Sequence, residues 1–220
     1  MPPDRNYLFV GDLIDRGSQS VECTLLAYAL KAKFPSNVHI VRGNHACDQV
    51  SRMYGFFDEC KEKLTEAVWS SFIDSFDRLP LAAIINGNVL AVHGGLSPDL
   101  ESRDDIRAIE RPVSVPESGL ITDLLWSDPD PDVQGWAASP RGASFTFGPD
   151  VIRQQAKALG VKLIVRSHQL VDAGSAWTAD KLMLTIFSAA RYCGSCKNGS
   201  AIVHIDAESQ ADVVQMKAPE

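Results

Sequence analysis

Hydrophobic positions along the chain fall into short apolar runs separated by longer amphipathic stretches. Runs bounded by Gly, Asn, Asp or Ser are typical of buried strands. They occupy residues 7–10, 38–41, 89–92, 163–165, 182–187 and 201–205. Apolar residues at helical spacing predict helices over residues 18–33, 67–78 and 149–159. The last of these begins at Pro149 and stops at Gly160, which are start and stop signals for a helix.

The order of these elements predicts an α/β fold. Early strands alternate with helices, while the last two strands follow each other closely, which favours a mixed sheet or two packed sheets. No repeat or low-complexity linker interrupts the chain, so we expect a single domain over residues 1–220. Residues 128–141 are rich in Asp, Pro, Gly and Ser and predict a long loop, and loops of this length are often functional.

Charge and apolar content limit the classes of function. The formal net charge is -7, which argues against nucleic acid or an anionic membrane as the main partner, because both require a positive surface. The longest apolar run, residues 79–85, is far shorter than the roughly 20 residues that span a bilayer. No signal-peptide pattern opens the sequence. We therefore expect a cytoplasmic or nuclear location.

Five cysteines, an odd number, suit reduced thiols in a reducing compartment. Cys193 and Cys196 have the C-x-x-C spacing of redox and zinc sites. No second pair completes a zinc site, and no thioredoxin-like pattern surrounds the motif. The favoured interpretation is two unpaired thiols in a turn.

The strongest chemical signal follows four of the predicted strands. Each strand ends in a residue of a metal-ligating type, usually with glycine close by, and these residues are Asp12, Asn44, His93 and His168. Ligand sites in α/β sheets form outside the carboxyl ends of strands, where glycine lets the backbone turn sharply. Carboxylate, amide and imidazole donors together suit Mn, Fe or Zn. Two such metals, roughly 3.5–4 Å apart, activate water and clamp a phosphoryl group.

A lone histidine after a strand is more often structural than metal-ligating. Four strand ends that all carry ligand-type side chains are hard to explain by packing, because buried imidazole and carboxylate groups are costly unless paired. His39 and His204 lie inside predicted strands, and no glycine turn follows either of them. We interpret both of these histidines as structural.

Nearby residues offer phosphate binding and proton transfer. Arg16 and Arg141 are candidate phosphate clamps, because guanidinium groups bind phosphate in bidentate fashion. The alternative for Arg141 is a surface charge on a loop. His45 is a candidate general acid, and Asp15 is a candidate carboxylate to orient it. The alternative for Asp15 is the N-cap of the helix predicted over residues 18–33.

These motifs resemble the PPP family of serine/threonine protein phosphatases. The matching stretches are residues 11–17 (G-D-x-V-D-R-G), 43–45 (G-N-H), 93–98 (H-G-G-L-S-P), 141–148 (R-G-x-S-F-T-F-G), 166–169 (R-x-H-Q) and 188–194 (S-A-P-N-Y-C-G). The run from 124 to 136 is most similar to the type 1 catalytic subunit. The resemblance implies a two-sheet metallophosphatase sandwich with flanking helices. It also implies two divalent metals, either Mn or Fe and Zn, whose bound water attacks phosphoserine or phosphothreonine directly.

Residue by residue, the resemblance implies that the four strand-end residues bind the metals, with Asp12 bridging them. It makes His45 the general acid, oriented by Asp15. It assigns phosphate binding to Arg16 and Arg141. Tyr192 would line the site.

Several departures from the family pattern stand out. The family's G-D-x-H-G motif supplies an Asp and a His to the first metal, and the sequence has no such motif. The second metal would keep its protein ligands, whereas the first would keep only Asp12. We therefore expect a domain that lacks its N-terminal segment and first strand and holds the first metal weakly. Ala46 replaces a glutamate, and Ala190 and Arg191 replace Pro-Asn.

The resemblance also implies phosphoprotein substrates and regulatory subunits that dock in an apolar groove. The corresponding stretch, residues 208–213, is polar here, and only Leu163 and Trp177 would keep part of the groove, so we expect weak docking. Asp128, Asp130 and Asp132 suggest tolerance for basic sequence around the phosphorylated residue, with a solvated loop as the alternative.

Three functions remain open. The first is an active phosphoserine/phosphothreonine phosphatase. The second is an inactive relic or pseudophosphatase that acts as a binding protein, which the missing motif, Ala46 and Arg191 favour. The third is a metallophosphoesterase of another substrate class, such as a dinucleotide polyphosphatase, and residues 124–130 and 141–148 argue against it.

Overall fold

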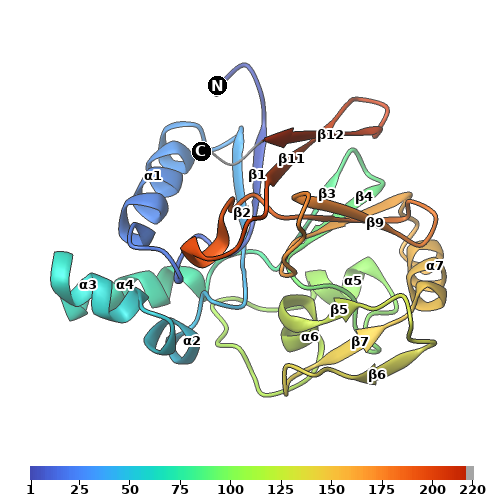
Figure 1. Ribbon diagram of the computed structural model, residues 1–220, viewed down its shortest axis with the longest axis horizontal. Helices are drawn as coiled ribbons and strands as arrows, with labels where there is room; N and C mark the ends of the chain where they lie inside the picture. The colour runs from blue at the N-terminus through green and yellow to red at the C-terminus, as the bar shows by residue number, and fades with distance from the viewer. Residues whose placement is uncertain (217–220) are drawn as a thin grey trace. The chain divides into compact units, whose positions relative to one another are not determined.

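The computed structural model describes residues 1–216, which form two compact units (Figure 1). The first unit comprises Met1–Pro80 and Glu110–Val115, and the second comprises Leu81–Ile109 and the chain from Pro116 onward. The prediction of a single catalytic domain over residues 1–220 stays a prediction. Across residues 1–216, no helix combines the length and the apolar character needed to cross a membrane.

A parallel strand pair is the frame of the first unit. The unit contains β1 (Tyr7–Val10), α1 (Ser20–Lys33), β2 (Val38–Val41), α2 (Asp48–Met53), α3 (Phe56–Lys63) and α4 (Glu66–Phe76). Strand β1 pairs with β2 from Tyr7 opposite Val38 to Val10 opposite Val41. Parallel neighbours need a crossover connection, and α1 supplies it. The carboxyl ends of both strands therefore lie at the same edge.

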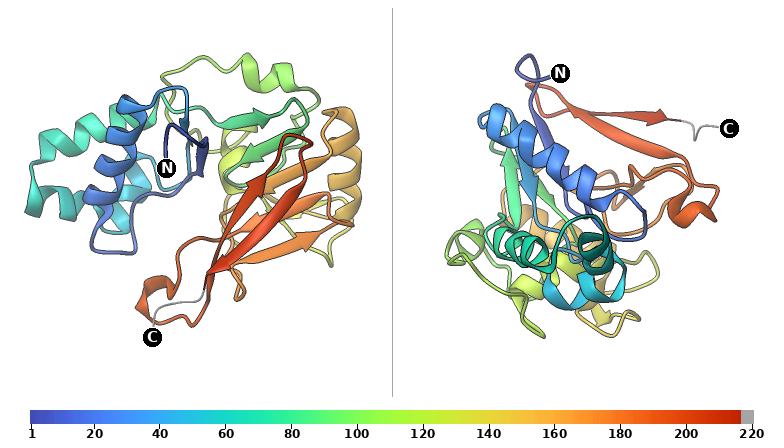
Figure 2. Two further views of the ribbon diagram at one scale, coloured as in Figure 1. Left: turned by 90° about the horizontal axis from the view of Figure 1, so that it is seen from above. Right: turned by 90° about the vertical axis from the view of Figure 1, so that its left-hand side faces the viewer.

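Aromatic side chains form the core of the first unit between its helices. The ring of Phe56 lies 5.3 Å from that of Phe72 and 6.0 Å from that of Phe76, measured between centroids. These three side chains are almost fully buried, and Trp69 packs edge-on against Phe57. Figure 2 shows α1 beside α3 and α4, the arrangement that this aromatic core requires.

The second unit is built on a five-stranded mixed sheet. Its strands, in sheet order, are β3 (Ala82–Ile85), β4 (Val89–Val92), β8 (Leu163–Arg166), β10 (Met183–Ile186) and β9 (Ser175–Thr178). The central strands β4, β8 and β10 run parallel, and the two outer strands are antiparallel to their neighbours. Every residue of β4, β8 and β10 is buried, which explains why these strands read as continuous apolar runs.

Smaller elements complete the second unit. Two smaller sheets contain β5 (Asp128–Pro129), β7 (Phe145–Phe147) and β6 (Trp136–Ala138), and β11 (Ser200–Ile205) with β12 (Ala211–Met216). The helical segments are α5 (Arg103–Arg107), α6 (Leu120–Trp126), α7 (Pro149–Ala158) and the 3-10 turn η1 (Tyr192–Gly194). Helix α7 has Pro149 in its first turn, where a missing backbone N–H is tolerated.

The structure confirms the predicted α/β class with mixed sheets. The predicted strands agree with the observed ones to within one residue at each end, and the three predicted helices agree to within two residues. The description of residues 128–141 as a loop is wrong in part, because β5 and β6 lie within it. Strands of two or three residues have too few positions to show alternation. Helices α2, α3, α5 and α6 were missed because each has at most eight residues, too few to show helical periodicity. All five cysteines are free thiols.

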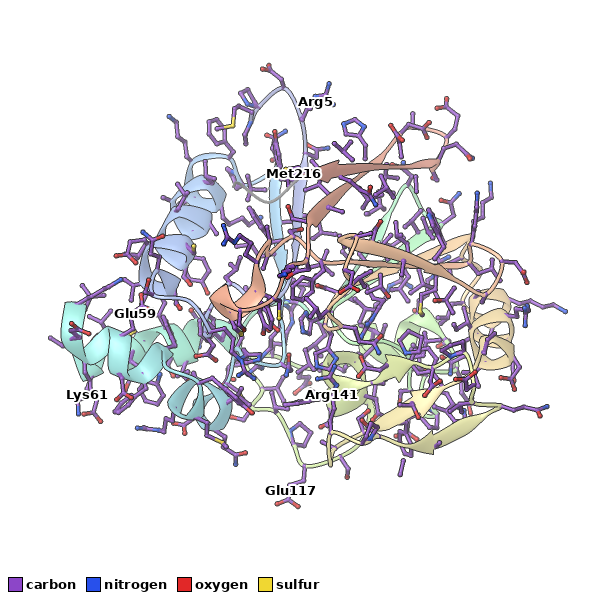
Figure 3. All side chains as sticks on the ribbon, in the orientation of Figure 1. Arg5, Glu59, Lys61, Glu117, Arg141 and Met216 are labelled. Atoms are coloured by element: carbon purple, nitrogen blue, oxygen red, sulfur yellow. The ribbon has the colours of Figure 1, made fainter. Side chains whose placement is uncertain are left out.

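A carboxylate from α3 caps the N-terminus of α1. The N-cap residue of α1, Gln19, makes no side-chain capping bond. Glu59 instead accepts hydrogen bonds from the backbone N–H groups of Ser20 and Val21, at 3.1 and 2.9 Å. Figure 3 shows Glu59 on the side of α3 nearer α1 and Lys61 on the opposite side. Burial raises the pKa of Glu59, but bonds from Val21 and Lys63 outweigh it and leave the pKa below its ordinary value.

This cap predicts a pH-dependent contribution to stability. Replacing Glu59 with Gln should lower the free energy of unfolding at pH 7 by about 1 kcal/mol, because a charged acceptor at a helix N-terminus is lost. The folded-state pKa is depressed, so the contribution is present above the unfolded pKa of 4.5 and disappears as the pH falls below it. Urea titrations at several pH values measure the difference. Glu62→Gln, at an exposed position on the same helix, is the control, and equal stability of the parent protein and Glu59→Gln at pH 7 would contradict the assignment.

Candidate active site

The strand ends of the first unit approach each other closely. Gly11 and Asp12 follow β1 with positive φ angles of 89° and 48°. A Cβ atom at Gly43, just after β2, would lie 2.1 Å from Asp12 Oδ1, so only glycine fits there. The same Asp12 oxygen accepts a hydrogen bond from the backbone N–H of His45 at 3.2 Å. The predicted ligand Asn44 is buried in this segment, between Gly43 and His45.

The side chains of Asp15 and His45, paired in the sequence analysis, are in contact. The Nδ1 atom of His45 lies 2.6 Å from Asp15 Oδ2, and both residues are buried. The other oxygen, Asp15 Oδ1, accepts from the backbone N–H of Phe56 at the start of α3. The alternative interpretation of Asp15 as the N-cap of α1 is wrong, because Gln19 occupies that position and Asp15 binds the start of α3 instead.

The environment of His45 favours its protonated form. Burial acts to lower the pKa of His45, but the hydrogen bond to Asp15 and the negative charges of Asp12 and Asp15 outweigh it. The net result is a pKa above the ordinary value. An imidazolium held in one orientation by a carboxylate is suited to donate a proton from Nε2.

Arg16 lies next to Asp15 in a left-handed backbone conformation, with φ of 66°. Its guanidinium carbon lies 3.9 Å from the centroid of the Tyr54 ring. Its backbone N–H also donates to the Tyr54 carbonyl at 3.4 Å. Arg16 is exposed, so its N–H groups remain accessible from solvent.

In the second unit, neighbouring parallel strands bring His93 and His168 together. Strand β4 leads to His93 and β8 leads to His168, and the two ring centroids are 5.2 Å apart. Gly94 lets this turn pack on α6, because a Cβ there would lie 2.5 Å from the carbonyl carbon of Leu125. The rings of Trp126 and His168 also lie nearly perpendicular to each other, with centroids 5.7 Å apart.

One nitrogen of His168 is buried without a hydrogen-bonding partner. The Nδ1 atom lies 3.1 Å from Asp128 Oδ1 and donates to it, while Nε2 is buried and has no partner among the described residues. Burial lowers the pKa of His168 to about 4, and the bond to Asp128 only partly opposes this. The ring is therefore neutral at pH 7 and keeps a lone pair on Nε2. Metal-ligating histidines have this pattern, with a carboxylate on the other nitrogen.

Asp128 joins His168 to two arginines. Arg141 Nε donates to Asp128 Oδ2 at 2.5 Å, and Arg166 Nη2 donates to Asp128 Oδ1 at 2.7 Å. Burial alone would raise the pKa of Asp128, but the bond from His168, the charge of Arg166 and the bond from Arg141 hold it well below its usual range. The carboxylate is 4% exposed, so the interpretation of Asp128 as a solvated acidic residue is wrong.

Arg166 is the fully buried member of this network. Burial lowers the pKa of Arg166 to about 10, so its charge persists at pH 7. Its guanidinium donates to Asp128 and to the carbonyls of Gly94 and Ser127, which ties the turn after β4 to the end of α6. From sequence, we did not identify Arg166 as a functional residue, and we related Asp128 only to basic sequence around the phosphorylated residue. The available signal was their place in two stretches that match the family, residues 166–169 and 124–136.

Arg141 is not an isolated surface charge, because it contacts both His168 and Asp128. Its Nη2 donates to the His168 carbonyl at 3.3 Å, and its side chain remains about one-third exposed. Figure 3 marks its position. The loop that carries it is fixed by Asp123, a buried carboxylate that accepts from Ser97 Oγ and Ser144 Oγ at 2.6 and 2.7 Å. Burial raises the pKa of Asp123.

Tyr192 lies in η1, where its ring meets Phe187 edge-on at 5.1 Å. Its backbone N–H donates to Asn198 Oδ1. The loop around it has left-handed backbone angles at Arg191 and Cys193. The expected role of Tyr192 in lining the site stays a prediction.

The predicted metal ligands divide between the two units. Asp12 and Asn44 belong to the first unit, and His93 and His168 belong to the second, so their convergence stays a prediction. Over residues 1–216, no group of three or more His, Cys, Asp or Glu side chains is arranged to hold a metal. The donor chemistry of each half nevertheless fits a divalent cation. The unpartnered His168 Nε2 and the close approach of Gly43 to Asp12 are the observations that support this.

Comparison with known proteins identifies the family. The family model for calcineurin-like phosphoesterases matches residues 1–172. A protein serine/threonine phosphatase from Saccharomyces cerevisiae, described as similar to human phosphatase PP5, superposes with a TM-score of 0.92 at 34% identity. That match covers 99% of this chain and 72% of the yeast chain.

Two structures of cold-active protein tyrosine phosphatases, one from a Shewanella species, match with TM-scores of 0.55 and 0.54. Each match covers 94% of this chain. The matches cover 67% and 68% of the two tyrosine phosphatase chains, respectively. Their identities of 14% and 13% show a shared fold alone. The likeness to type 1 enzymes in particular stays a prediction. The chain belongs to the calcineurin-like phosphoesterases and, within them, to the PPP family of serine/threonine protein phosphatases.

Proposed function

We propose that this protein is a metal-dependent phosphatase of phosphoserine and phosphothreonine in proteins. One observation carries the proposal. The carboxylate of Asp128 binds both His168, whose buried Nε2 lacks a partner, and Arg141, whose guanidinium is partly exposed. A metal-ligating nitrogen beside a phosphate-binding cation is what hydrolysis of a phosphomonoester requires. The likeness to the yeast phosphatase supports the proposal.

In this proposal, cations are held by Asp12, Asn44, His93 and His168. Bound divalent cations supply Lewis-acid chemistry toward a phosphate ester and water. The chain's own contribution begins with His168, where Asp128 fixes the ring orientation and leaves Nε2 as the donor atom.

His45 would act on the leaving group. Its Nδ1 is occupied by Asp15, so Nε2 is the atom that delivers a proton to the departing seryl or threonyl oxygen. The carboxylates of Asp12 and Asp15 favour the protonated ring before the reaction. Arg16 and Arg141 would bind the phosphate oxygens, and Tyr192 would border them.

A second candidate function is a phosphoprotein-binding protein without catalysis. Two departures from the family pattern within the sequence, Ala46 next to His45 and Arg191 next to Tyr192, favour it. The phosphate-binding arginines would persist in such a protein. Phosphoproteins are thus the expected ligands in both cases, while regulatory subunits and their docking groove stay predictions.

Release of phosphate from a phosphoserine peptide in the presence of Mn²⁺ separates the two functions. We expect turnover that EDTA abolishes, because the proposed chemistry depends on the cations. His168→Asn should eliminate turnover, and His39→Asn, at an exposed histidine that bonds Ser36, should leave it unchanged. Saturable binding of the peptide by the parent protein without any phosphate release would contradict the catalytic proposal. It would favour the second function, a phosphoprotein-binding protein without catalysis.

The Asp128 network predicts coupled effects on activity and stability. Asp128→Asn should reduce turnover about 10- to 100-fold, because Asp128 binds Nδ1 of His168 and so orients the Nε2 atom that is the proposed metal ligand. It should also lower the free energy of unfolding by about 3 kcal/mol, because Arg166 would lose its only buried counter-charge among the described residues. Steady-state kinetics and urea unfolding measure the two effects.

Asp130→Asn is the matched control for Asp128→Asn. Asp130 lies two residues away, and its carboxylate accepts from the backbone N–H of Asp132 rather than from a side chain of the site. With a phosphoserine peptide that has no basic flanking residues, we expect parental turnover and stability from this variant. If Asp128→Asn behaved in the same way as Asp130→Asn, the network would have no part in the reaction.

A further inference from the structure

We infer that Tyr54 is the positioning residue for the phosphate-binding guanidinium of Arg16, an assignment that rests on the proposed phosphatase function. Tyr54 follows α2 directly, and its backbone N–H closes the last turn of that helix by donating to Val50 at 3.1 Å. The residue is therefore fixed in the fold independently of Arg16. The residue is 38% exposed, so one part packs and another borders solvent.

Two contacts tie Arg16 to this one residue. The guanidinium carbon of Arg16 lies over the Tyr54 ring at 3.9 Å from its centroid, which is cation–π distance. The backbone N–H of Arg16 donates to the carbonyl of Tyr54. Arg16 follows Asp15, and both have left-handed φ angles, a conformation that non-glycine residues avoid unless surrounding contacts impose it. Tyr54 supplies contacts of that kind.

The Tyr54 ring positions the guanidinium of Arg16 but does not neutralise its charge. Over residues 1–216, no carboxylate lies within ion-pair distance of its guanidinium, whereas Arg141 is paired with Asp128. An aromatic face orients a guanidinium without occupying its N–H groups, which therefore stay available to an anion. The arrangement is therefore suited to phosphate binding rather than to a structural ion pair.

Another stacked arginine in the same unit shows the structural version of this contact. Arg52 lies over Trp69 at 4.0 Å and over Phe57 at 4.3 Å, and it also pairs with Asp48 at 3.1 Å. Stacking there accompanies a neutralised charge. Phe57 therefore provides a matched control position for the removal of an aromatic ring from beneath an arginine.

Tyr54 also contacts the proposed general acid. The centroid of its ring lies 5.2 Å from that of His45, with the planes tilted by 57°. One aromatic ring thus contacts both the proposed phosphate-binding residue and the proposed proton-donating residue. The hydroxyl makes no hydrogen bond among the described residues, so the ring face carries the contact and phenylalanine should replace it.

Kinetics of Tyr54→Leu and Tyr54→Phe with a phosphoserine peptide test the inference. Tyr54→Leu should raise KM and the inhibition constant of inorganic phosphate in parallel, by about 2- to 30-fold, which is the range for a lost cation–π contact. The effect on kcat should be smaller. Tyr54→Phe should restore both constants, and Phe57→Leu should leave them at parental values. A general loss of packing would not affect the phosphate constant in this selective way.

A double-mutant cycle shows whether the effect passes through Arg16. In an Arg16→Ala background, Tyr54→Leu should have no further effect on the phosphate constant. An equal additional effect in that background, or unchanged constants in Tyr54→Leu itself, would overturn the inference. If Tyr54→Leu fails to fold, as thermal unfolding would show, Tyr54→Thr in the same cycle decides the question. A parent protein with no turnover would overturn the phosphatase proposal together with this inference, whereas an active parent with an insensitive Tyr54 would overturn the inference alone.

Discussion

The buried carboxylate of Asp128 is the interaction on which the second half of the proposed site depends. It is the first residue of β5, accepts from Arg141 and Arg166, and holds Nδ1 of His168. A buried carboxylate is costly unless it is paired, and here the cations that stabilise it are themselves fixed by the loops after β4 and β8. The same charge therefore maintains the fold locally and orients the groups proposed to act on phosphate.

The first unit also contains a buried carboxylate that binds a histidine, although the other partners differ. Asp15 is buried, binds Nδ1 of His45 and accepts from the start of α3, so one carboxylate fixes both a helix and an imidazole. The two histidines end in opposite states. Nearby negative charge raises the pKa of His45, whereas burial lowers the pKa of His168 to about 4. A protonated donor and a neutral ligand are the two forms that phosphomonoester hydrolysis requires.

Sequence patterns predicted the parts of this arrangement that depend on local periodicity. The strands before Asp12 and His93 were found at their observed bounds because their residues are continuous apolar runs. Asp128 was misjudged because its burial comes from pairing with Thr146 and from distant arginines, and nothing in residues 128–132 reveals either. Tyr54 was missed for a similar reason, since its partners lie 38 and 9 residues away, at Arg16 and His45.

The central claim is that the unpartnered Nε2 of His168 is a metal ligand. Equilibrium dialysis against Mn²⁺, followed by metal analysis per chain, tests it without requiring turnover. The account predicts that the parent protein retains Mn²⁺ and that His168→Ala loses it. His39→Ala should retain it, because His39 is an exposed residue of β2. Equal metal content in the parent protein and the His168→Ala variant would contradict the account.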